Sequence, residues 1–329
     1  MKEKILVIGS NSFSGANFVD HVIRQGAQVI GVSRSPQPHA VFLPYKNGET
    51  ANFCFHRLDL NNDLDKIMEV IKSFKPDYVV NFAAQSMVAE SWQHPEHWFQ
   101  TNVVANIKLH DRLRKCDFLK KYVHISTPEV YGSCAGLIKE NTIYSPSTPY
   151  AVSRAAADMS LMSFYRAYNF PVVFTRAANV YGPGQQLYRI IPKTILHFLL
   201  GKKLPLHGGG RSVRSFIHIR DVAQGTLLAA RHALPGQIFH FSTLRQISIR
   251  SLVEMIAEKM NVSFENNVEV VGDRLGKDAA YLLDSSQAKN ILHWEDKISL
   301  EQGIEEIIKW VKDNLQVLNK QPLAYEHKP

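Results

Sequence analysis

The sequence predicts an α/β protein, a Rossmann-type doubly wound parallel sheet with a smaller α/β lobe. Two observations lead to this class. Short apolar runs alternate with helical patterns through about residue 179, an order typical of parallel strands with helices on both faces of the sheet. Beyond Gly182 the pattern becomes irregular, with a turn of glycine, proline and glutamine and then helical patterns at 191–200, 249–260 and 300–314. This change predicts the second lobe.

The first element is an apolar strand at residues 5–8, which ends at Gly9, and a helical pattern begins after Gly15. Strand, glycine turn and helix follow one another in this way in dinucleotide-binding sites, where amides at the helix N-terminus hold a pyrophosphate. Ser12 stands where a middle glycine is expected, and its hydroxyl could donate a hydrogen bond to the phosphate. We expect cofactor contacts along the whole turn, from Gly9, Asn11, Ser12, Phe13, Ser14 and Gly15.

The second strand, at residues 29–32, indicates which cofactor binds. It ends at Ser33 and Arg34, without the carboxylate that would bind the ribose 2′-hydroxyl of NAD. A guanidinium flanked by serines can hold the 2′-phosphate of NADP. The sequence therefore predicts NADP or NAD, with NADP favoured.

Two further strands complete the predicted cofactor site. The third ends at Asp59 and Leu60, where the carboxylate is placed to meet the adenine edge. The fourth, at 77–81, leads into the small-residue turn Ala83, Ala84 and Gln85, where the chain can pass under the pyrophosphate. Later strands are predicted at 122–126 and 171–176.

A hydroxyl, a carboxylate, a phenol and a cation occur close together in the sequence, at Thr127, Glu129, Tyr150 and Arg154. Oxidation of a sugar carbinol needs a base for the hydroxyl proton, and a phenol can serve if a nearby cation lowers its pKa from about 10. Arg154 follows Tyr150 by four residues, which places both on one helix face. Glu129 could then take a proton beside the new ketone.

These motifs resemble extended short-chain dehydrogenase/reductases of the NAD-dependent epimerase/dehydratase family, most of all nucleotide-sugar 4,6-dehydratases of the dTDP-glucose type. The resemblance covers nearly the whole chain. Segments 31–34 and 83–92 also resemble GDP-mannose dehydratases and GDP-sugar 4-ketoreductases, so the nucleotide stays open. The matching segments are the glycine turn, 83–86, 101–102, 126–132, Tyr150 with Arg154, 175–183, 214–218 and 273–278, of which the last is the most specific to dehydratases.

The resemblance implies roles for single residues. Tyr150 would be the base at the sugar C4 hydroxyl, Thr127 would hydrogen-bond the C4 oxygen, and Glu129 would remove the C5 proton. Arg154 stands where the family has lysine; it would lower the pKa of Tyr150 and donate to the cofactor ribose. Substrate contacts are expected from Ser86, Thr127, Asn179, Arg189, Arg214 and Arg274, with Arg214 and Arg274 holding the diphosphate.

The implied reaction is C4 oxidation, loss of the C6 hydroxyl as water and return of hydride to C6, in deoxysugar or surface-polysaccharide biosynthesis. Pro128 is the main departure, because dTDP-glucose enzymes carry an aspartate there that helps water to leave. Glu129 could pass its proton to the C6 hydroxyl, a bound water could donate it, or no elimination occurs. A 4-ketoreductase or epimerase, and a catalytically degenerate nucleotide-binding homologue, therefore stay as alternatives.

Composition narrows the class of protein further. The three cysteines, Cys54, Cys116 and Cys134, have unrelated spacings, which argues against disulfides and a zinc site and favours a cytoplasmic protein with no metal. The net charge of +8 comes from scattered residues, so nucleic acid is not expected as a partner. No apolar run reaches about 18 residues, and no membrane span is expected.

The predicted division is a dinucleotide-binding domain at 1–180, to which segments near 213–244 return, and a nucleotide-sugar-binding lobe at 181–212 and 245–329. The resemblance implies a homodimer that pairs the alanine-rich helix after Tyr150, and a nucleotide-diphosphate sugar as substrate. The C-terminal tail, 321–329, is expected to fray.

Overall fold

The computed structural model describes residues 2–48, 51–134, 136–272 and 282–328. Its largest sheet has seven strands in the order β12–β7–β5–β4–β1–β2–β3, and all neighbours in it run parallel. The predicted doubly wound sheet is confirmed. Its strands are β1 (Lys4–Ile8), β2 (Gln28–Ser33), β3 (Phe53–Arg57), β4 (Tyr78–Asn81), β5 (Lys121–Ile125), β7 (Val172–Ala177) and β12 (Ile238–Phe241).

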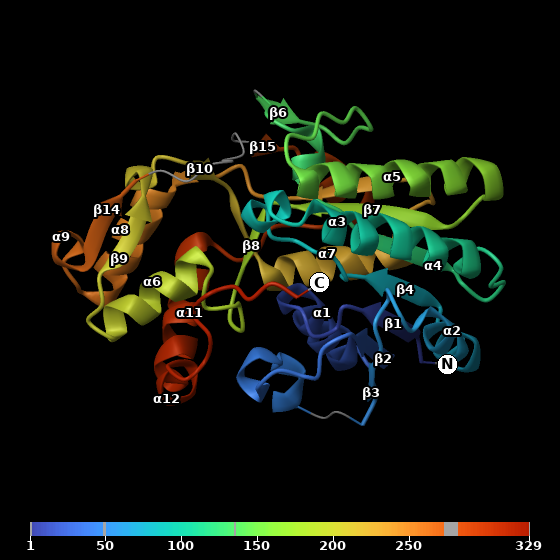
Figure 1. Ribbon diagram of the computed structural model, residues 1–329, viewed down its shortest axis with the longest axis horizontal. Coiled ribbons are helices and arrows are strands. Elements are labelled where there is room, and N and C mark those ends of the chain that lie inside the picture. Colours follow the sequence, from blue (N-terminus) through green and yellow to red (C-terminus); the bar gives the residue numbers. More distant parts are fainter. Residues whose placement is uncertain (1, 49–50, 135, 273–281, 329) are drawn as a thin grey trace.

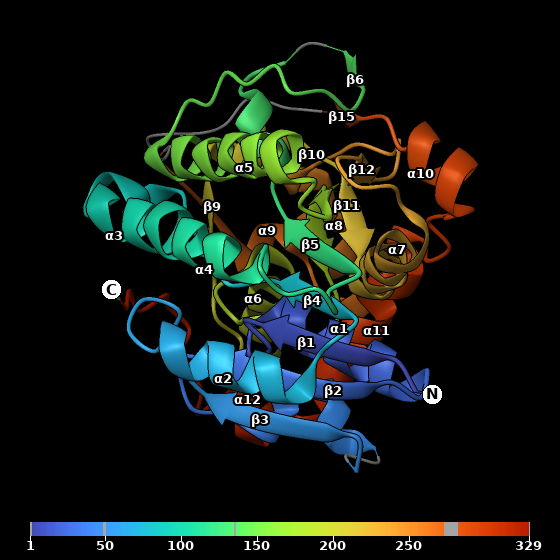
Figure 2. The same cartoon turned by 90° about the vertical axis from the view of Figure 1, so that its right-hand side faces the viewer.

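Strand β1 shows why the sheet needs helices on both faces. Successive side chains of a strand point to opposite faces, and here both sets are buried: Ile5 and Val7 belong to one apolar cluster, Leu6 and Ile8 to another. One face is covered by α1 (Phe13–Arg24) and α7 (Ile219–His232), the other by α2 (Leu64–Phe74), α4 (Asn106–Leu113) and α5 (Pro149–Tyr168), as Figures 1 and 2 show.

The strand order reverses at β1. The chain builds β1, β2 and β3 in one direction and then crosses to β4, β5 and β7 on the other side. Loops after β1 and β4 therefore diverge, and ligands of doubly wound sheets bind in the resulting crevice. The glycine turn and the 83–85 turn both lie at this point.

A smaller lobe lies beside the sheet, on the left in Figure 1. Its apolar cluster unites side chains of α6, α8 and α11, such as Ile195, Ile256 and Ile304. The division of the chain into two domains stays a prediction that this separate cluster supports. The lobe contains α6 (Ile190–Leu199), β9 (Leu204–His207), β10 (Val213–Arg214), β13 (Ile247–Ser248), α8 (Ile249–Met260), α9 (Phe264–Asn267), β14 (Val268–Val271), α11 (Leu300–Asp313) and α12 (Leu315–Leu318).

The segment that was expected to return to the main sheet does so only in part. Strand β12 joins the sheet beside β7, and α7 covers one face. However, β11 (Phe216–His218) pairs with β8 (Asn179–Tyr181) in a separate two-stranded sheet.

The remaining elements are short. They are α3 (Pro95–Phe99), a π-helical turn at Gln100–Ala105, a 3-10 turn at Pro128–Tyr131, further 3-10 turns at Ala40–Phe42, Pro44–Asn47, Ala89–Trp92 and Gly208–Gly210, β6 (Leu137–Ile138), β15 (Leu282–Leu283) and α10 (Ser286–Leu292).

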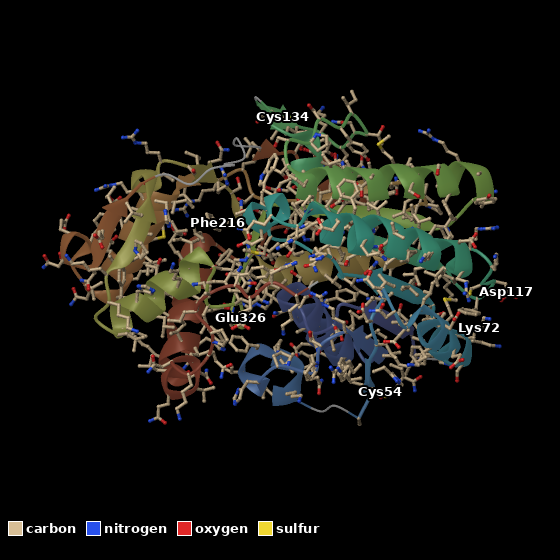
Figure 3. The ribbon with its side chains drawn as sticks, viewed as in Figure 1. Cys54, Lys72, Asp117, Cys134, Phe216 and Glu326 are labelled. Atoms are coloured by element: carbon tan, nitrogen blue, oxygen red, sulfur yellow. The ribbon has the colours of Figure 1, made fainter. Side chains whose placement is uncertain are left out.

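The three cysteines are free thiols, and Cys54 and Cys134 lie at opposite sides of the molecule in Figure 3. The expected absence of disulfides agrees with this arrangement. Among the residues that the structure describes, no helix combines the length and the apolar character that crossing a membrane requires.

His240 on β12 predicts how stability depends on pH. It is fully buried, its Nδ1 lies 3.1 Å from the carbonyl of Asp284, and its Nε2 lies 2.8 Å from the hydroxyl of Tyr131. Arg176 donates a hydrogen bond to the same hydroxyl, so this hydroxyl can direct its own proton to Nε2. This arrangement requires a neutral imidazole. Burial, with the charge of Arg176, lowers the pKa of His240 to about 3.

The unfolded chain therefore binds a proton at His240 below about pH 6.5, whereas the folded chain does so only near pH 3. We expect the free energy of unfolding to be up to about 2 kcal/mol lower at pH 5 than at pH 7 through this residue. Urea unfolding at both pH values measures this difference in the free energy of unfolding. In His240→Gln the glutamine side chain cannot take up a proton, so the part of the difference that His240 contributes should disappear. An unchanged difference in the variant would show that His240 titrates normally.

Candidate functional site

The glycine turn after β1 has the geometry that a bound pyrophosphate requires. Gly9 has a φ of 81°, and a Cβ there would lie 2.6 Å from the backbone nitrogen of Ala83. At Gly15 a Cβ would lie 2.2 Å from the Gly9 carbonyl oxygen, so glycine is needed for close packing of α1. The first turn of α1 has no acidic residue, which suits an anion at this helix N-terminus.

Ser12 has a different role from the one expected. Its hydroxyl donates to the Gly9 carbonyl at 2.8 Å and accepts from the Gly15 amide at 3.0 Å. It is the N-cap of α1. Because a hydroxyl has a single proton, it is not placed to donate to a phosphate as well. The serine side chain therefore stabilises the turn.

A cavity of about 460 Å³ opens over the carboxyl ends of β1, β2 and β4. In it the Ser33 hydroxyl accepts from the Asn11 amide at 3.0 Å, and the Asp59 carboxylate is held by Asn61 and Asn62 at 2.9 Å each. This cavity is lined by most of the expected cofactor residues, namely Gly9, Asn11, Ser12, Ser33, Arg34, Asp59, Leu60, Ala83, Ala84 and Gln85.

The tail, expected to fray, instead reaches this cavity. The carbonyl of Lys328 accepts hydrogen bonds from Arg34 at 3.0 Å and from Gln85 at 2.6 Å. Figure 1 shows the end of the chain returning from the lobe to the sheet. No pattern in the sequence indicates this contact, because it joins residues 243 or more positions apart.

A second, larger cavity of about 650 Å³ lies between the sheet and the lobe. It brings together the four expected catalytic side chains with the expected substrate residues and the start of α1. Its lining includes Ser12, Phe13, Ser14, Ser86, Thr127, Glu129, Tyr150, Arg154, Asn179, Arg189 and Arg214. Arg274, with the 273–278 motif, lies outside the described residues.

Local structure positions Thr127 and Tyr150. Thr127 follows the end of β5 by two residues and is the N-cap of the 3-10 turn at Pro128–Tyr131, accepting from the Glu129 amide at 3.3 Å. Tyr150 lies in the first turn of α5, where Thr148 accepts from the Ala151 amide at 3.1 Å and Pro149 suits the first helical position. The Tyr150 phenol lies within hydrogen-bonding reach of the Thr127 hydroxyl.

The electrostatics of Tyr150 differ from the expectation. Burial, followed by the negative charge of Glu129, raises the pKa of Tyr150 to about 12, although Arg154 acts in the opposite direction. The nearby cation was expected to lower this pKa. The lowering of the pKa by Arg154 is outweighed here, because burial of the phenol and the charge of the Glu129 carboxylate both raise the pKa of Tyr150.

The Arg154 guanidinium lies against strand β5. It donates to the carbonyl of Ile125 and lies 3.3 Å from Nε2 of His124, and only 2% of the residue is exposed. Arginine is longer than lysine and planar, so its guanidinium can reach the backbone of the strand. In this structure Arg154 hydrogen-bonds strand β5, and its expected donation to a cofactor ribose stays a prediction.

Below Arg154 lies a buried polar network, centred on Asp158, that sequence reasoning missed. Asp158 accepts from Arg176 at 2.8 Å and from Ser126 at 2.7 Å. Burial by itself would raise the pKa of the Asp158 carboxyl. The charge of Arg176, together with His124 and a hydrogen bond from Ser126, outweighs burial and lowers this pKa to about 2. Asp158 lies one helical turn after Arg154, and this spacing was the available signal.

The expected phosphate ligands lie on the lobe side of the larger cavity. Asn179 donates to the Ser215 carbonyl at 3.1 Å, and Arg214 donates to the Val213 carbonyl at 2.8 Å. Lys193 lines the same wall and was missed. It follows Arg189 by four residues at the start of α6, which was a signal for a second cation on that helix face.

The family follows from a comparison of sequences. The model of the GDP-mannose 4,6 dehydratase family matches residues 6–307. The chain belongs to this family. A probable dTDP-glucose 4,6-dehydratase of Sinorhizobium fredii is 30% identical, over 94% of this chain and 93% of the relative. The resemblance inferred from the motifs is thereby confirmed.

Solved structures agree in fold. A dTDP-glucose 4,6-dehydratase of Bacillus anthracis, in complex with NAD, has a TM-score of 0.87 and 29% identity, over 96% of this chain and 98% of that one. A UDP-glucose 4-epimerase of Thermotoga maritima, with UDP-glucose, has a TM-score of 0.86 and 27% identity, over 95% and 99%. Three nucleotides occur among these names, so they do not decide the base.

Proposed function

We propose that the protein is an NAD(P)-dependent nucleotide-sugar 4,6-dehydratase. The observation that carries the proposal is that Thr127, Glu129 and Tyr150 line one cavity, beside a glycine turn suited to a dinucleotide. A phenol, a hydroxyl and a carboxylate at one sugar are the groups that oxidation and elimination at adjacent carbons require. Arg189, Lys193 and Arg214, on the opposite wall, would hold the diphosphate.

The first step is oxidation at C4. Tyr150 would take the proton of the C4 hydroxyl, while the Thr127 hydroxyl orients the C4 oxygen. The chemistry that a nicotinamide supplies when bound is acceptance of hydride from C4 and its later return to C6. Because the pKa of Tyr150 is about 12 without ligands, the proton transfer needs added positive charge near the phenol.

The second step is loss of water. The C5 proton becomes acidic beside the C4 ketone, and Glu129 would remove it. The C6–oxygen bond then breaks, and the same carboxyl would return its proton to the leaving hydroxyl. Pro128 has no proton to donate, so Glu129 would serve as both base and acid. Return of the hydride to C6, and protonation of C5 by a proton that Glu129 takes up from solvent, would complete the product.

A test of this function is incubation with GDP-, dTDP-, UDP- and CDP-hexoses, followed by mass spectrometry. Loss of one water from one of them, without net consumption of cofactor, is the expected result. A 4-ketoreductase or epimerase is the second candidate, and Pro128 is the observation that favours it, because the acid of the dTDP-glucose enzymes is absent. Interconversion or reduction without loss of water would favour that candidate. If cofactor and nucleotide bind without turnover, the protein is a degenerate homologue.

For the cofactor, we propose that NADP binds more tightly than NAD. The support is Arg34 at the end of β2 with Ser33 beside it, both in the smaller cavity. The similar Bacillus anthracis enzyme holds NAD, which keeps NAD as the alternative. A 2′-phosphate would compete with the Lys328 carbonyl for Arg34, and an anion is the stronger acceptor.

Arg34→Ala should weaken NADP binding by about 1.5–3 kcal/mol, the size of a charged hydrogen bond, and should leave NAD nearly unaffected. Calorimetry with both cofactors measures this difference. Arg24→Ala is the matched control, because Arg24 is an exposed arginine paired with Asp20 and does not line the cavity. An order-of-magnitude preference for NAD that Arg34→Ala does not change would contradict the proposal.

We also propose a homodimer that pairs α5, supported by apolar side chains that α5 leaves exposed. Val152 and Met159, seven residues apart and so on one face of the helix, are 38% and 60% exposed, and α4 lies beside α5 in Figures 1 and 2. Two helices from each subunit could bury these side chains together. Sedimentation of the wild type and of Met159→Glu tests the pairing, since a charge there should favour the monomer.

A further inference from the structure

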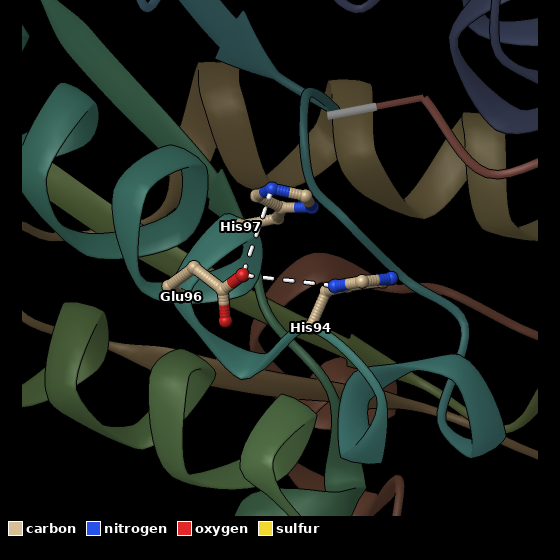
Figure 4. A group of neighbouring side chains, drawn as sticks. All are labelled: His94, Glu96 and His97. Atoms are coloured by element: carbon tan, nitrogen blue, oxygen red, sulfur yellow. Dashed lines mark ion pairs between the residues drawn. The ribbon is translucent and has the colours of Figure 1, made fainter.

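Three metal-binding side chains converge at the start of α3. His94 precedes the helix, and Glu96 and His97 lie in its first turn. Oε1 of Glu96 lies 3.7 Å from Nδ1 of His94 and 3.8 Å from Nε2 of His97. One ligand atom from each of the three lies within 4.8 Å of the others. Figure 4 shows both imidazole nitrogens directed at the same carboxylate oxygen.

This arrangement is close to that of a zinc site. With metal–ligand bonds of about 2.0–2.1 Å, tetrahedral geometry places ligand atoms about 3.4 Å apart. The two separations from Oε1 of Glu96 exceed this value by a few tenths of an ångström, and all three ligand atoms lie within 4.8 Å of one another. The side chains of His94, Glu96 and His97 are 54%, 66% and 28% exposed, so they can rotate and a cation can reach them.

The other nitrogen of His97 provides an independent observation. Its Nδ1 lies 2.8 Å from Nε2 of His327, whose ring stacks between His97 and Trp98 at 5.1 and 5.0 Å. If Nδ1 of His97 carries the proton and donates it to His327, Nε2 keeps its lone pair for a cation. Histidines that bind metals are held in this way by a partner at the second nitrogen.

His327 links the cluster to the cofactor cavity. The next residue, Lys328, accepts through its carbonyl from Arg34 and Gln85. An ion that fixes the His97 ring would therefore fix His327, and with it the tail across the cavity.

We propose that His94, Glu96 and His97 bind a divalent transition-metal ion, and that this ion fastens the C-terminal tail over the cofactor cavity through His327. Two imidazoles and one carboxylate favour zinc over magnesium or calcium, which prefer oxygen ligands only. The expectation of no metal was drawn from the spacing of the cysteines. The proposed site contains no cysteine, so that spacing could not indicate it. Its contact in the tail, His327, lies 230 residues from His97 in the sequence.

The test is calorimetric titration of the full chain, freed of any affinity tag and of metal, with zinc chloride. One equivalent should bind. His94→Ala and His97→Ala should each weaken binding by more than about 100-fold, and His327→Ala by about 10- to 100-fold, as for an outer partner. His232→Ala, which removes an exposed histidine at the end of α7, should change nothing. Equal weakening by His232→Ala, or no zinc binding, would overturn the site.

Hydrogen–deuterium exchange tests the link to the tail without measuring activity. Zinc should slow amide exchange in the peptide that contains 323–328 in the wild type but not in His97→Ala. Circular dichroism of His97→Ala at neutral pH shows whether that variant keeps its fold, and Glu96→Gln gives a second, milder loss of a ligand. Zinc binding that leaves exchange in the tail unchanged would refute the fastening.

Discussion

Tyr150→Phe should lower turnover by about two to four orders of magnitude, the range of a lost general base, while cofactor and nucleotide binding stay nearly unchanged. Phenylalanine keeps the ring, which is 8% exposed, so the packing of α5 is preserved. Only the hydroxyl near Thr127 is lost. The measurement is kcat with the nucleotide sugar that the panel identifies, together with calorimetry for the cofactor.

Tyr168→Phe is the matched control, because Tyr168 ends the same helix and is 55% exposed. That variant should keep full activity. Near-normal turnover of Tyr150→Phe would show that another group is the base. Loss of cofactor binding in Tyr150→Phe would instead show that the phenol positions ligands and does not transfer the proton.

Glu129→Gln should stop the reaction after oxidation at C4, with overall turnover reduced at least about 100-fold. Glutamine keeps the shape of the side chain but cannot take the C5 proton. Reduced nicotinamide should therefore accumulate on the enzyme and be visible by its absorbance. In deuterated water the wild type should place deuterium at C5 of its product, and the variant should not.

Pro128→Asp tests whether Glu129 serves as the acid as well. It would add a second carboxyl next to Glu129, in the wall of the larger cavity that Pro128 lines. Elimination in Pro128→Asp should therefore be as fast as in the wild type or faster. If the wild type consumes added reduced cofactor in proportion to a 4-keto sugar, the protein is a ketoreductase and not a dehydratase.

The predicted strands and glycine turn depend on local chemistry, and this explains their agreement with the structure. Buried parallel strands need continuous apolar runs, and residues 5–8 have one because both faces of β1 are covered. Gly9 and Gly15 are required by close approaches within or beside one turn. The four-residue spacing of Tyr150 and Arg154 likewise follows from the helix alone.

Features that depend on distant segments were not predictable in this way. Whether β11 joins the main sheet depends on which partner its edge meets, and it meets β8. The contact of the tail with Arg34 joins residues 294 positions apart, and no periodicity records such a pairing.

The sequence by itself determined the parallel sheet and the glycine turn between β1 and α1, because strand, turn and helix signals are local. For the same reason it placed Thr127 and Glu129 just after a strand and Tyr150 at the start of a helix. Only the tertiary structure decided that Arg154 hydrogen-bonds β5, that burial and Glu129 raise the pKa of Tyr150, and that His327 meets His97. The physical reason is that burial, desolvation and charge pairing are set by what packs around a side chain, and those neighbours come from distant parts of the chain.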